Sequence, residues 1–132
     1  VIYTDSNTKD LNNSSIVLKL VYGQNSFLLT GDATSVSEKK MLNQNLKADV
    51  LKIGHHGSSY STSEEFLSKV SPSYAIISVG ANNSYNHPAP STIKRLNDHG
   101  IPIYKTSELG TILVTSDGTN LKITNFATDT NG

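Results

Sequence analysis

The chain of 132 residues has the length of one domain with a hydrophobic core, and its 11 basic residues balance its 11 acidic residues. This balance argues against a protein that covers nucleic acid with positive charge, although a local phosphate site is still compatible with it. Cysteine is absent, which excludes disulfides and thiolate metal sites, and no apolar run approaches the roughly 18 residues of a membrane-spanning helix. No signal peptide is expected. We predict one domain or fragment over residues 1–132, with flexible ends at 1–11 and 127–132.

Seven strands are predicted from apolar alternation, apolar runs and turn signals, at 15–22, 27–32, 48–53, 74–81, 102–106, 110–116 and 120–126. Helices are predicted at 35–46, 61–70 and 89–100, and the last of them has prolines near its start and a glycine at its end. The order ββ-α-β-α-β-α-βββ is mixed α/β. Three helices are few for covering both faces of a sheet, so one face is expected to lack its partner layer.

An S-x-x-E pattern begins each of the first two predicted helices. Ser35 with Glu38, and Ser61 with Glu64, are therefore expected to form capping boxes.

Three polar clusters follow predicted strands at their carboxyl ends, where α/β sheets tend to place their sites. They are Asp32 in "LLTGD", then His55, His56, Ser58 and Ser59 in "LKIGHHGSS", then Asn82, Asn83, Tyr85 and His87 in "SVGANNSYNHPAPS". No Walker loop or dinucleotide fingerprint occurs.

Each of the first two clusters has two interpretations. Asp32 is either a turn or cap residue at the entry of a helix, or a carboxylate that bridges two metal ions. His55 and His56, which we call the histidine pair, either lie in a surface turn or include a ligand for Zn, Mn or Fe. Both imidazoles can face one site only if the strand has ended, and the flanking glycines permit such a turn.

The remaining polar residues are less specific. His87 either caps and packs its loop or binds a phosphate oxygen near the start of a helix. His99 lies in the last turn of a predicted helix, where a cation complements the helix dipole, and we interpret it as structural. Ser58 and Ser59 lack a nucleophile-elbow motif, which favours hydroxyls that orient a substrate.

Four stretches together resemble the metallo-β-lactamase-fold domain of the ComEC family of bacterial DNA-internalisation competence proteins. They are "NNSSIVLKLVYGQNSFLLTGD", "ADVLKIGHHGSSYSTSEEFL", "YAIISVGANNSYNHP" and "YKTSELGTILVTSDG". The resemblance covers residues 12–123. The combination of T-G-D, L-K-x-G-H-H-G-S and N-x-Y-x-H-P is specific, whereas each motif alone is weak.

This resemblance implies an αββα sandwich with a dinuclear Zn or Mn centre that hydrolyses a phosphoester through a metal-activated water. Asp32 then matches the bridging aspartate, one of His55 and His56 is a metal ligand, and His87 with Ser58 or Ser59 steadies the anionic substrate. The family implies a bacterial protein whose parent lies in the cell membrane, with this domain in a soluble compartment, or is secreted.

The H-x-H-x-D-H cluster of that fold is absent, so the chain resembles its C-terminal half. We therefore expect the N-terminal half of the same fold, or a second copy of the chain, to cover the open sheet face. The chain alone is expected to bind metal weakly and to be inactive. The alternatives are a non-catalytic DNA-binding or assembly domain of a competence channel, and a secreted phosphoester hydrolase.

Overall fold

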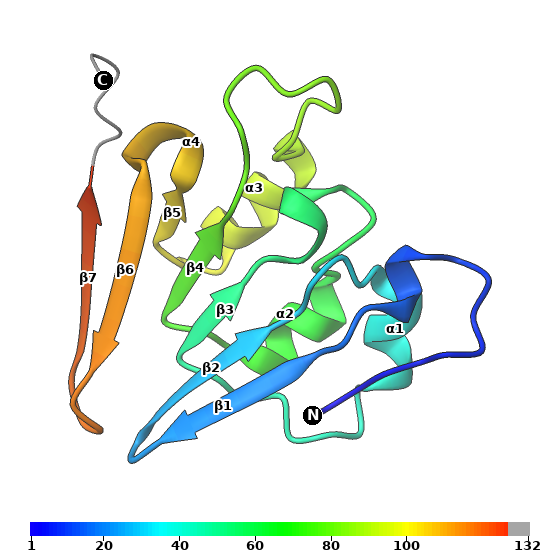
Figure 1. Cartoon of the computed structure of the whole chain (residues 1–132), viewed down its shortest axis with the longest axis horizontal. Helices are drawn as coiled ribbons and strands as arrows, with labels where there is room; N and C mark the ends of the chain where they lie inside the picture. The colour runs from blue at the N-terminus through cyan, green and yellow to red at the C-terminus, as the bar shows by residue number, and fades with distance from the viewer. Residues whose placement is uncertain (127–132) are drawn as a thin grey trace.

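The structure, a computed structural model, describes residues 1–126 and has the predicted α/β architecture with a mixed sheet (Figure 1). Five strands form the main sheet in the order of the sequence: β1 (Leu18–Tyr22), β2 (Asn25–Leu29), β3 (Val50–Lys52), β4 (Tyr74–Ile77) and β5 (Ile103–Lys105). The first pair is antiparallel and the other three pairs are parallel. The carboxyl ends of β2, β3 and β4 therefore lie at one edge of the sheet.

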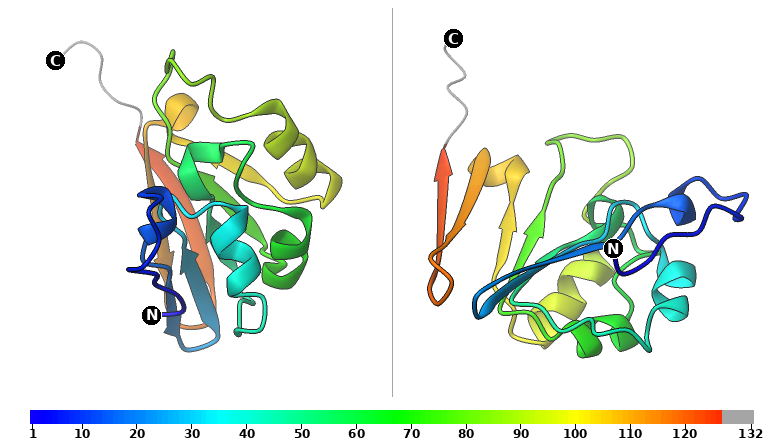
Figure 2. Two further views of the ribbon diagram at one scale, coloured as in Figure 1. Left: turned by 90° about the vertical axis from the view of Figure 1, so that its right-hand side faces the viewer. Right: turned by 60° about the horizontal axis from the view of Figure 1, so that its bottom comes forward.

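The three predicted helices are present, and Figure 2 shows them together on one side of the main sheet. They are α1 (Ser35–Lys40), α2 (Glu64–Val70) and α3 (Pro90–Asp98). A short fourth helix, α4 (Thr106–Leu109), was not predicted and connects β5 to a hairpin of β6 (Thr111–Ser116) and β7 (Leu121–Phe126). Two 3-10 turns, η1 (Asn12–Ser14) and η2 (Gly54–Gly57), complete the described elements.

The core lies between the main sheet and these helices. Leu28, Leu51 and Ala75 occupy paired positions on neighbouring strands and are fully buried. Phe66 and Leu67 of α2 belong to the same apolar cluster. Because side chains alternate across a strand, the residues next to these three point to the opposite face of the sheet.

That opposite face, which we call the open face, carries apolar side chains in contact with solvent. It includes Leu18, Leu20, Tyr22 and Leu29, which are 40–57% exposed. The apolar alternation that predicted β1 thus marks the face away from the helices. A large exposed apolar patch is typical of a surface that another structure covers.

The tip of the β6–β7 hairpin meets the β1–β2 turn. Gln24 donates from its backbone amide to the carbonyl of Gly118 (2.6 Å). A Cβ at Gly23 would lie 2.5 Å from that carbonyl oxygen, so the close approach of the two turns requires glycine there. Figure 1 shows the hairpin beside β5. The helices lie on the other side of the main sheet and do not cover the open face (Figure 2).

Both predicted capping boxes are wrong, because tertiary contacts occupy the side chains concerned. Thr34, not Ser35, caps α1 by accepting from the amide of Val36, and Ser63 caps α2 by accepting from the amide of Phe66. The hydroxyl of Ser61 donates instead to the carbonyl of Ala33 (2.8 Å). The carboxylate of Glu38 accepts from the amides of Thr62 and Ser63, well outside its own helix.

Near the start of the chain, Tyr3 pairs with Val17 in an antiparallel bridge. Residues 127–132, predicted as a flexible end, lie outside the described residues. Among residues 1–126, no helix has the length and apolar character needed to cross a membrane.

Candidate functional site at the carboxyl ends of the strands

The predicted site residues gather in one cavity, although they come from three separate loops. The cavity has a volume of about 690 Å³ and opens beyond the carboxyl ends of β2, β3 and β4. Its lining consists of Asn12, Asp32, His55, His56, Ser58, Ser59, Tyr60, Tyr85 and His87. All six residues given possible roles in metal or substrate binding are among them, together with Asn12 and Tyr60, which the motifs did not indicate.

The histidine pair lies in the η2 turn directly after β3. His55 and His56 both have left-handed backbone conformations, with φ of 49° and 55°. Such angles cost a non-glycine residue roughly 1–2 kcal/mol each, and strained residues of this kind concentrate at functional sites. The glycines contribute at other points of the turn: Gly57 has φ +83°, while a Cβ at Gly54 would lie 3.1 Å from the carbonyl oxygen of Ala33.

Two hydrogen bonds attach this turn to the loop that carries Asp32. The amide of His55 donates to the carbonyl of Gly31 (2.9 Å), and the hydroxyl of Thr30 donates to the carbonyl of Lys52 (2.7 Å). The amide of Asp32 donates to the Ser15 hydroxyl (3.0 Å). Since Thr34 is the cap of α1, Asp32 is not a cap residue, and its carboxylate is directed to the cavity.

His56 and Asp32 are two potential metal ligands that lie side by side in the cavity. The Nδ1 atom of His56 lies 2.7 Å from the carbonyl oxygen of Ser78. A carbonyl can only accept, so Nδ1 carries the hydrogen and the lone pair of the ring is on Nε2. Nε2 is 3.7 Å from Oδ1 of Asp32. Histidine ligands of metals are commonly held in this way, by a backbone carbonyl on the other ring nitrogen.

The ring of His55 has the rings of both His56 and His87 as neighbours. The ring centroids of His55 and His87 are 5.9 Å apart, and those of His55 and His56 are 6.4 Å apart. The Nδ1 atoms of His55 and His87 are buried without a hydrogen-bond partner in the protein. Buried polar atoms are normally paired, so these two nitrogens are exceptions within the site.

Burial is the main cause that lowers the pKa of His87 below its ordinary value, and the neighbouring His55 and His56 lower it further. His87 is therefore neutral at pH 7. Its loop is held by Asn83, whose side chain accepts from the amide of His87 (2.9 Å) and donates to its carbonyl (2.7 Å). Tyr85 stacks on the His87 ring, with centroids 5.7 Å apart and an interplanar angle of 16°.

The two serines differ in accessibility. Ser58 is only 2% exposed, and its oxygen accepts from the amide of Tyr60 (3.2 Å), so it orders the turn that follows the histidine pair. Ser59 is exposed on the same cavity wall. His99 lies outside the cavity, where its Nε2 is 2.6 Å from Oε1 of Glu64 and connects α3 to α2.

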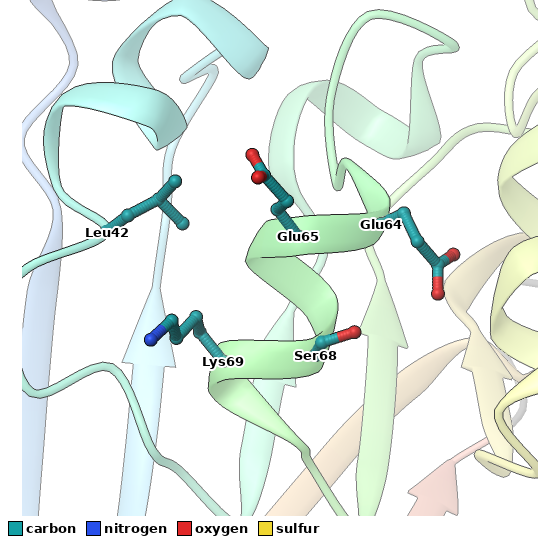
Figure 3. Close-up of a pocket in the computed structure, with 5 residues that line it drawn as sticks. All are labelled: Leu42, Glu64, Glu65, Ser68 and Lys69. Carbon is teal, nitrogen blue, oxygen red and sulfur yellow. The ribbon is translucent and has the colours of Figure 1, made fainter.

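A second hollow of about 460 Å³ lies on the outer surface of α2 (Figure 3). It is lined by Leu42, Glu64, Glu65, Ser68 and Lys69. Glu64 points away from Leu42 and Lys69 in this view and is engaged by His99. This hollow therefore lacks a convergent set of polar groups.

The cavity at the strand ends offers a divalent metal a pair of ligands. An imidazole nitrogen and a carboxylate oxygen both suit Zn²⁺ and Mn²⁺. Within residues 1–126, however, no three histidine, aspartate or glutamate side chains are arranged to hold one ion. Asp32 and His56 therefore supply only part of the ligand set of a metal site.

The fold and the cavity define an α/β protein with a histidine- and aspartate-lined site at the carboxyl ends of its parallel strands.

No family model matches the chain. It is 48% identical over 103 residues to ComE operon protein 3 of Bacillus subtilis. The aligned region is 76% of this chain and 13% of that protein. It is 40% identical over 106 residues to competence protein ComA of Neisseria gonorrhoeae (78% of this chain, 15% of the relative). It is 41% identical over 107 residues to recombination protein 2 of Haemophilus influenzae (81% and 14%).

These similarities point to the family of bacterial competence proteins, as the sequence motifs predicted, and they match a bacterial origin. The chain spans only 13–15% of the length of these relatives. The metallo-β-lactamase fold stays a prediction.

Proposed function

We propose that this chain forms one wall of a metal-dependent phosphodiesterase site in a bacterial protein of DNA uptake. One observation carries the proposal: the Ser78 carbonyl orients His56 so that its Nε2 lone pair lies 3.7 Å from the Asp32 carboxylate. Of the two histidines of the pair, His56 is thus the proposed ligand. The similarity to competence proteins supports DNA as the substrate.

Each wall residue has a separate proposed task. His56 and Asp32 would hold a Zn²⁺ or Mn²⁺ ion, which would supply Lewis acidity toward a water molecule and a phosphoryl oxygen. His87, neutral at pH 7, donates a hydrogen bond to a phosphate oxygen or accepts a proton there. The exposed Ser59 hydroxyl offers a further hydrogen bond to the substrate, while the buried Ser58 keeps the turn in place.

The remaining ligands come, in this proposal, from the N-terminal half of the same fold, within the larger part of the relatives that this chain does not match. The open face supports this arrangement, since a second layer packed there would bury Leu18, Leu20 and Leu29. Lys52 lies between Leu29 and Ile76 in the sheet register. Burial lowers the pKa of Lys52, and the carboxylate of Asp32 opposes this effect, so the two groups interact electrostatically.

The test is hydrolysis of single-stranded DNA and of bis-p-nitrophenyl phosphate by the full-length protein with Mn²⁺ or Zn²⁺. We expect His56→Ala and Asp32→Ala each to lower the rate by about 100-fold, because each removes a ligand of the ion that stabilises transition-state charge. His99→Ala is the matched control, because its ring lies outside the cavity, and should retain the wild-type rate. If all three variants have the same rate, the ligand assignment is wrong; an inactive wild-type protein that still binds DNA favours the non-catalytic alternative.

A separate prediction concerns the open face. The chain of 132 residues alone is expected to self-associate through this face, and Leu20→Glu should shift it to monomer by placing a charge at a position that is 57% exposed. Sedimentation velocity at several concentrations measures the change. Val36→Glu is the control, because Val36 is 56% exposed but lies in α1, away from the sheet. A wild-type chain that is monomeric at all concentrations contradicts the prediction.

A further inference from the structure

Two exposed tyrosines stand on the wall of the site cavity. Tyr60 is 74% exposed and Tyr85 is 78% exposed, and both line the same cavity as the histidine pair. They come from different loops, one after η2 and one after β4. Nothing in the proposed chemistry of metal and phosphate uses these phenol rings, and tyrosine rings are enriched at binding interfaces.

Both rings are presented by ordered backbone. The turn before Tyr60 is closed by the Ser58 hydroxyl, and the carbonyl of Tyr60 accepts from the amide of Ser35 (2.7 Å). The loop that carries Tyr85 is closed by the Asn83 side chain across residues 83–87. A ligand that stacks on these rings therefore meets loops already held in place, which reduces the entropy lost on binding.

Tyr85 is also the outer member of a row of rings. His56, His55, His87 and Tyr85 follow one another at centroid separations of 6.4, 5.9 and 5.7 Å. The inner face of Tyr85 is covered by the nearly parallel His87 ring, and its outer face is left to solvent. A planar ligand that adds to this row would stack on Tyr85, with its attached groups near the histidines.

The charge of the cavity indicates that phosphate contacts with lysine or arginine cannot supply most of the affinity for a nucleic acid here. The described residues that line it include no lysine or arginine, and Asp32 is acidic. A nucleic acid held only by phosphate contacts needs cations, whereas base stacking on an aromatic ring does not. Bases in a duplex are stacked within the helix and cannot reach the rings, but bases of a single strand can.

We propose that Tyr60 and Tyr85 are stacking platforms that bind bases of a single-stranded nucleic acid and place its backbone over the histidine pair. The placement of the nucleic-acid backbone over the histidines rests on the proposed function. The stacking itself requires no metal. It can therefore be tested with the metal removed.

The experiment measures binding of a fluorescein-labelled oligothymidylate of about 12 nucleotides, a length within the usual site sizes, to the 132-residue chain in EDTA. An abasic strand of equal length and a duplex serve as the comparison ligands. We expect Tyr60→Ala and Tyr85→Ala each to weaken binding by about tenfold at both low and high salt, because stacking is not screened. The abasic strand and the duplex should bind to the wild-type chain as weakly as the oligothymidylate binds to a variant with both Tyr60→Ala and Tyr85→Ala.

The matched control is Tyr22→Ala, which removes a tyrosine that is 56% exposed on the open face and outside the cavity. Tyr85→Phe and Tyr60→Phe keep the ring and should bind like the wild type, which separates stacking from loss of folding. Equal binding of the abasic strand, equal losses in the Tyr22 variant, or no binding by the wild-type chain would each overturn the inference. Tyrosine-dependent binding by a protein without hydrolytic activity would instead refute only the proposed function.

Discussion

Replacement of Gly57 by alanine is expected to lower the free energy of unfolding by about 3 kcal/mol. Two effects add at this position. Its φ of +83° disfavours any residue with a Cβ, and the added Cβ would lie 2.6 Å from Cβ and 3.0 Å from Cα of Pro88. The Gly57 carbonyl also accepts from the amide of Ala89 (2.8 Å), so displacement of Pro88 would separate the histidine pair from the loop of His87.

Two other glycines separate these effects in urea unfolding experiments. Gly100 has φ +67° but no atom within 4 Å of an added Cβ, so Gly100→Ala should cost about 1 kcal/mol through backbone strain alone. Gly80 has neither a positive φ nor a near neighbour, and Gly80→Ala should leave stability unchanged within about 0.5 kcal/mol. A loss at Gly57 no greater than that at Gly100 would contradict the predicted clash with Pro88.

The order of strands and helices could be predicted from the sequence because it depends on local patterns. Each of the seven predicted strands has a counterpart, and the α/β class with a mixed sheet is confirmed. The helix caps could not be predicted in the same way. The S-x-x-E pattern is a local signal. Glu38 instead accepts from two backbone amides that lie 24 and 25 residues further along the chain, and a local sequence pattern cannot predict such a contact.

In the candidate site, too, the features set by local patterns could be predicted and those set by distant contacts could not. The motifs placed Asp32, the histidine pair and His87 after the ends of predicted strands. These residues line one cavity because parallel strands end at one edge of the sheet. They left the two histidines equivalent. The difference between them comes from the Ser78 carbonyl, which lies at the end of another strand and orients only His56. Tyr60 was missed as a residue of the cavity lining, and its place in the sequence directly after Ser58 and Ser59 is the signal that could have indicated it.

Loss of Glu38 is the second substitution with a large expected effect, because this buried carboxylate holds the loop that follows the histidine pair. Glu38 is 2% exposed and accepts from the amides of Thr62 and Ser63, the latter at 2.8 Å. Arg95 donates to the carbonyl of Thr62 (2.7 Å), so this peptide segment is held from both sides. Thr62 has a left-handed φ of 58° and needs such support.

Glu38→Ala should therefore lower the free energy of unfolding by about 3 kcal/mol, because it leaves the buried amide of Thr62 and the partly buried amide of Ser63 without acceptors. Glu38→Gln should lose roughly half as much, since its single carbonyl oxygen can replace only part of the carboxylate. Glu65→Ala, at an exposed position of α2, is the control and should change stability by less than about 0.5 kcal/mol. Equal stability of the three variants would contradict the role of Glu38.

The same carboxyl group has a defined effect on the pH dependence of stability. Burial raises the pKa of Glu38 above its ordinary value of 4.5, against the opposing effect of the hydrogen bonds from Ser63 and Thr62. Between the unfolded and the folded pKa, the folded chain binds more protons than the unfolded chain. The part of the stability that comes from this raised pKa is therefore fully present below pH 4.5 and is lost as the pH rises through the folded pKa, whereas the hydrogen bonds to the two amides are a separate contribution.

Glu38→Gln cannot titrate at this position, so the comparison with the wild type isolates the effect from that of the other carboxyl groups. As the pH rises above 4.5, the difference in unfolding free energy should shift in favour of the variant. Urea unfolding of both proteins at several pH values measures this shift. A difference that does not change with pH would mean that burial and the two amide donors cancel, and that the loop beside the histidine pair keeps its stability over this range.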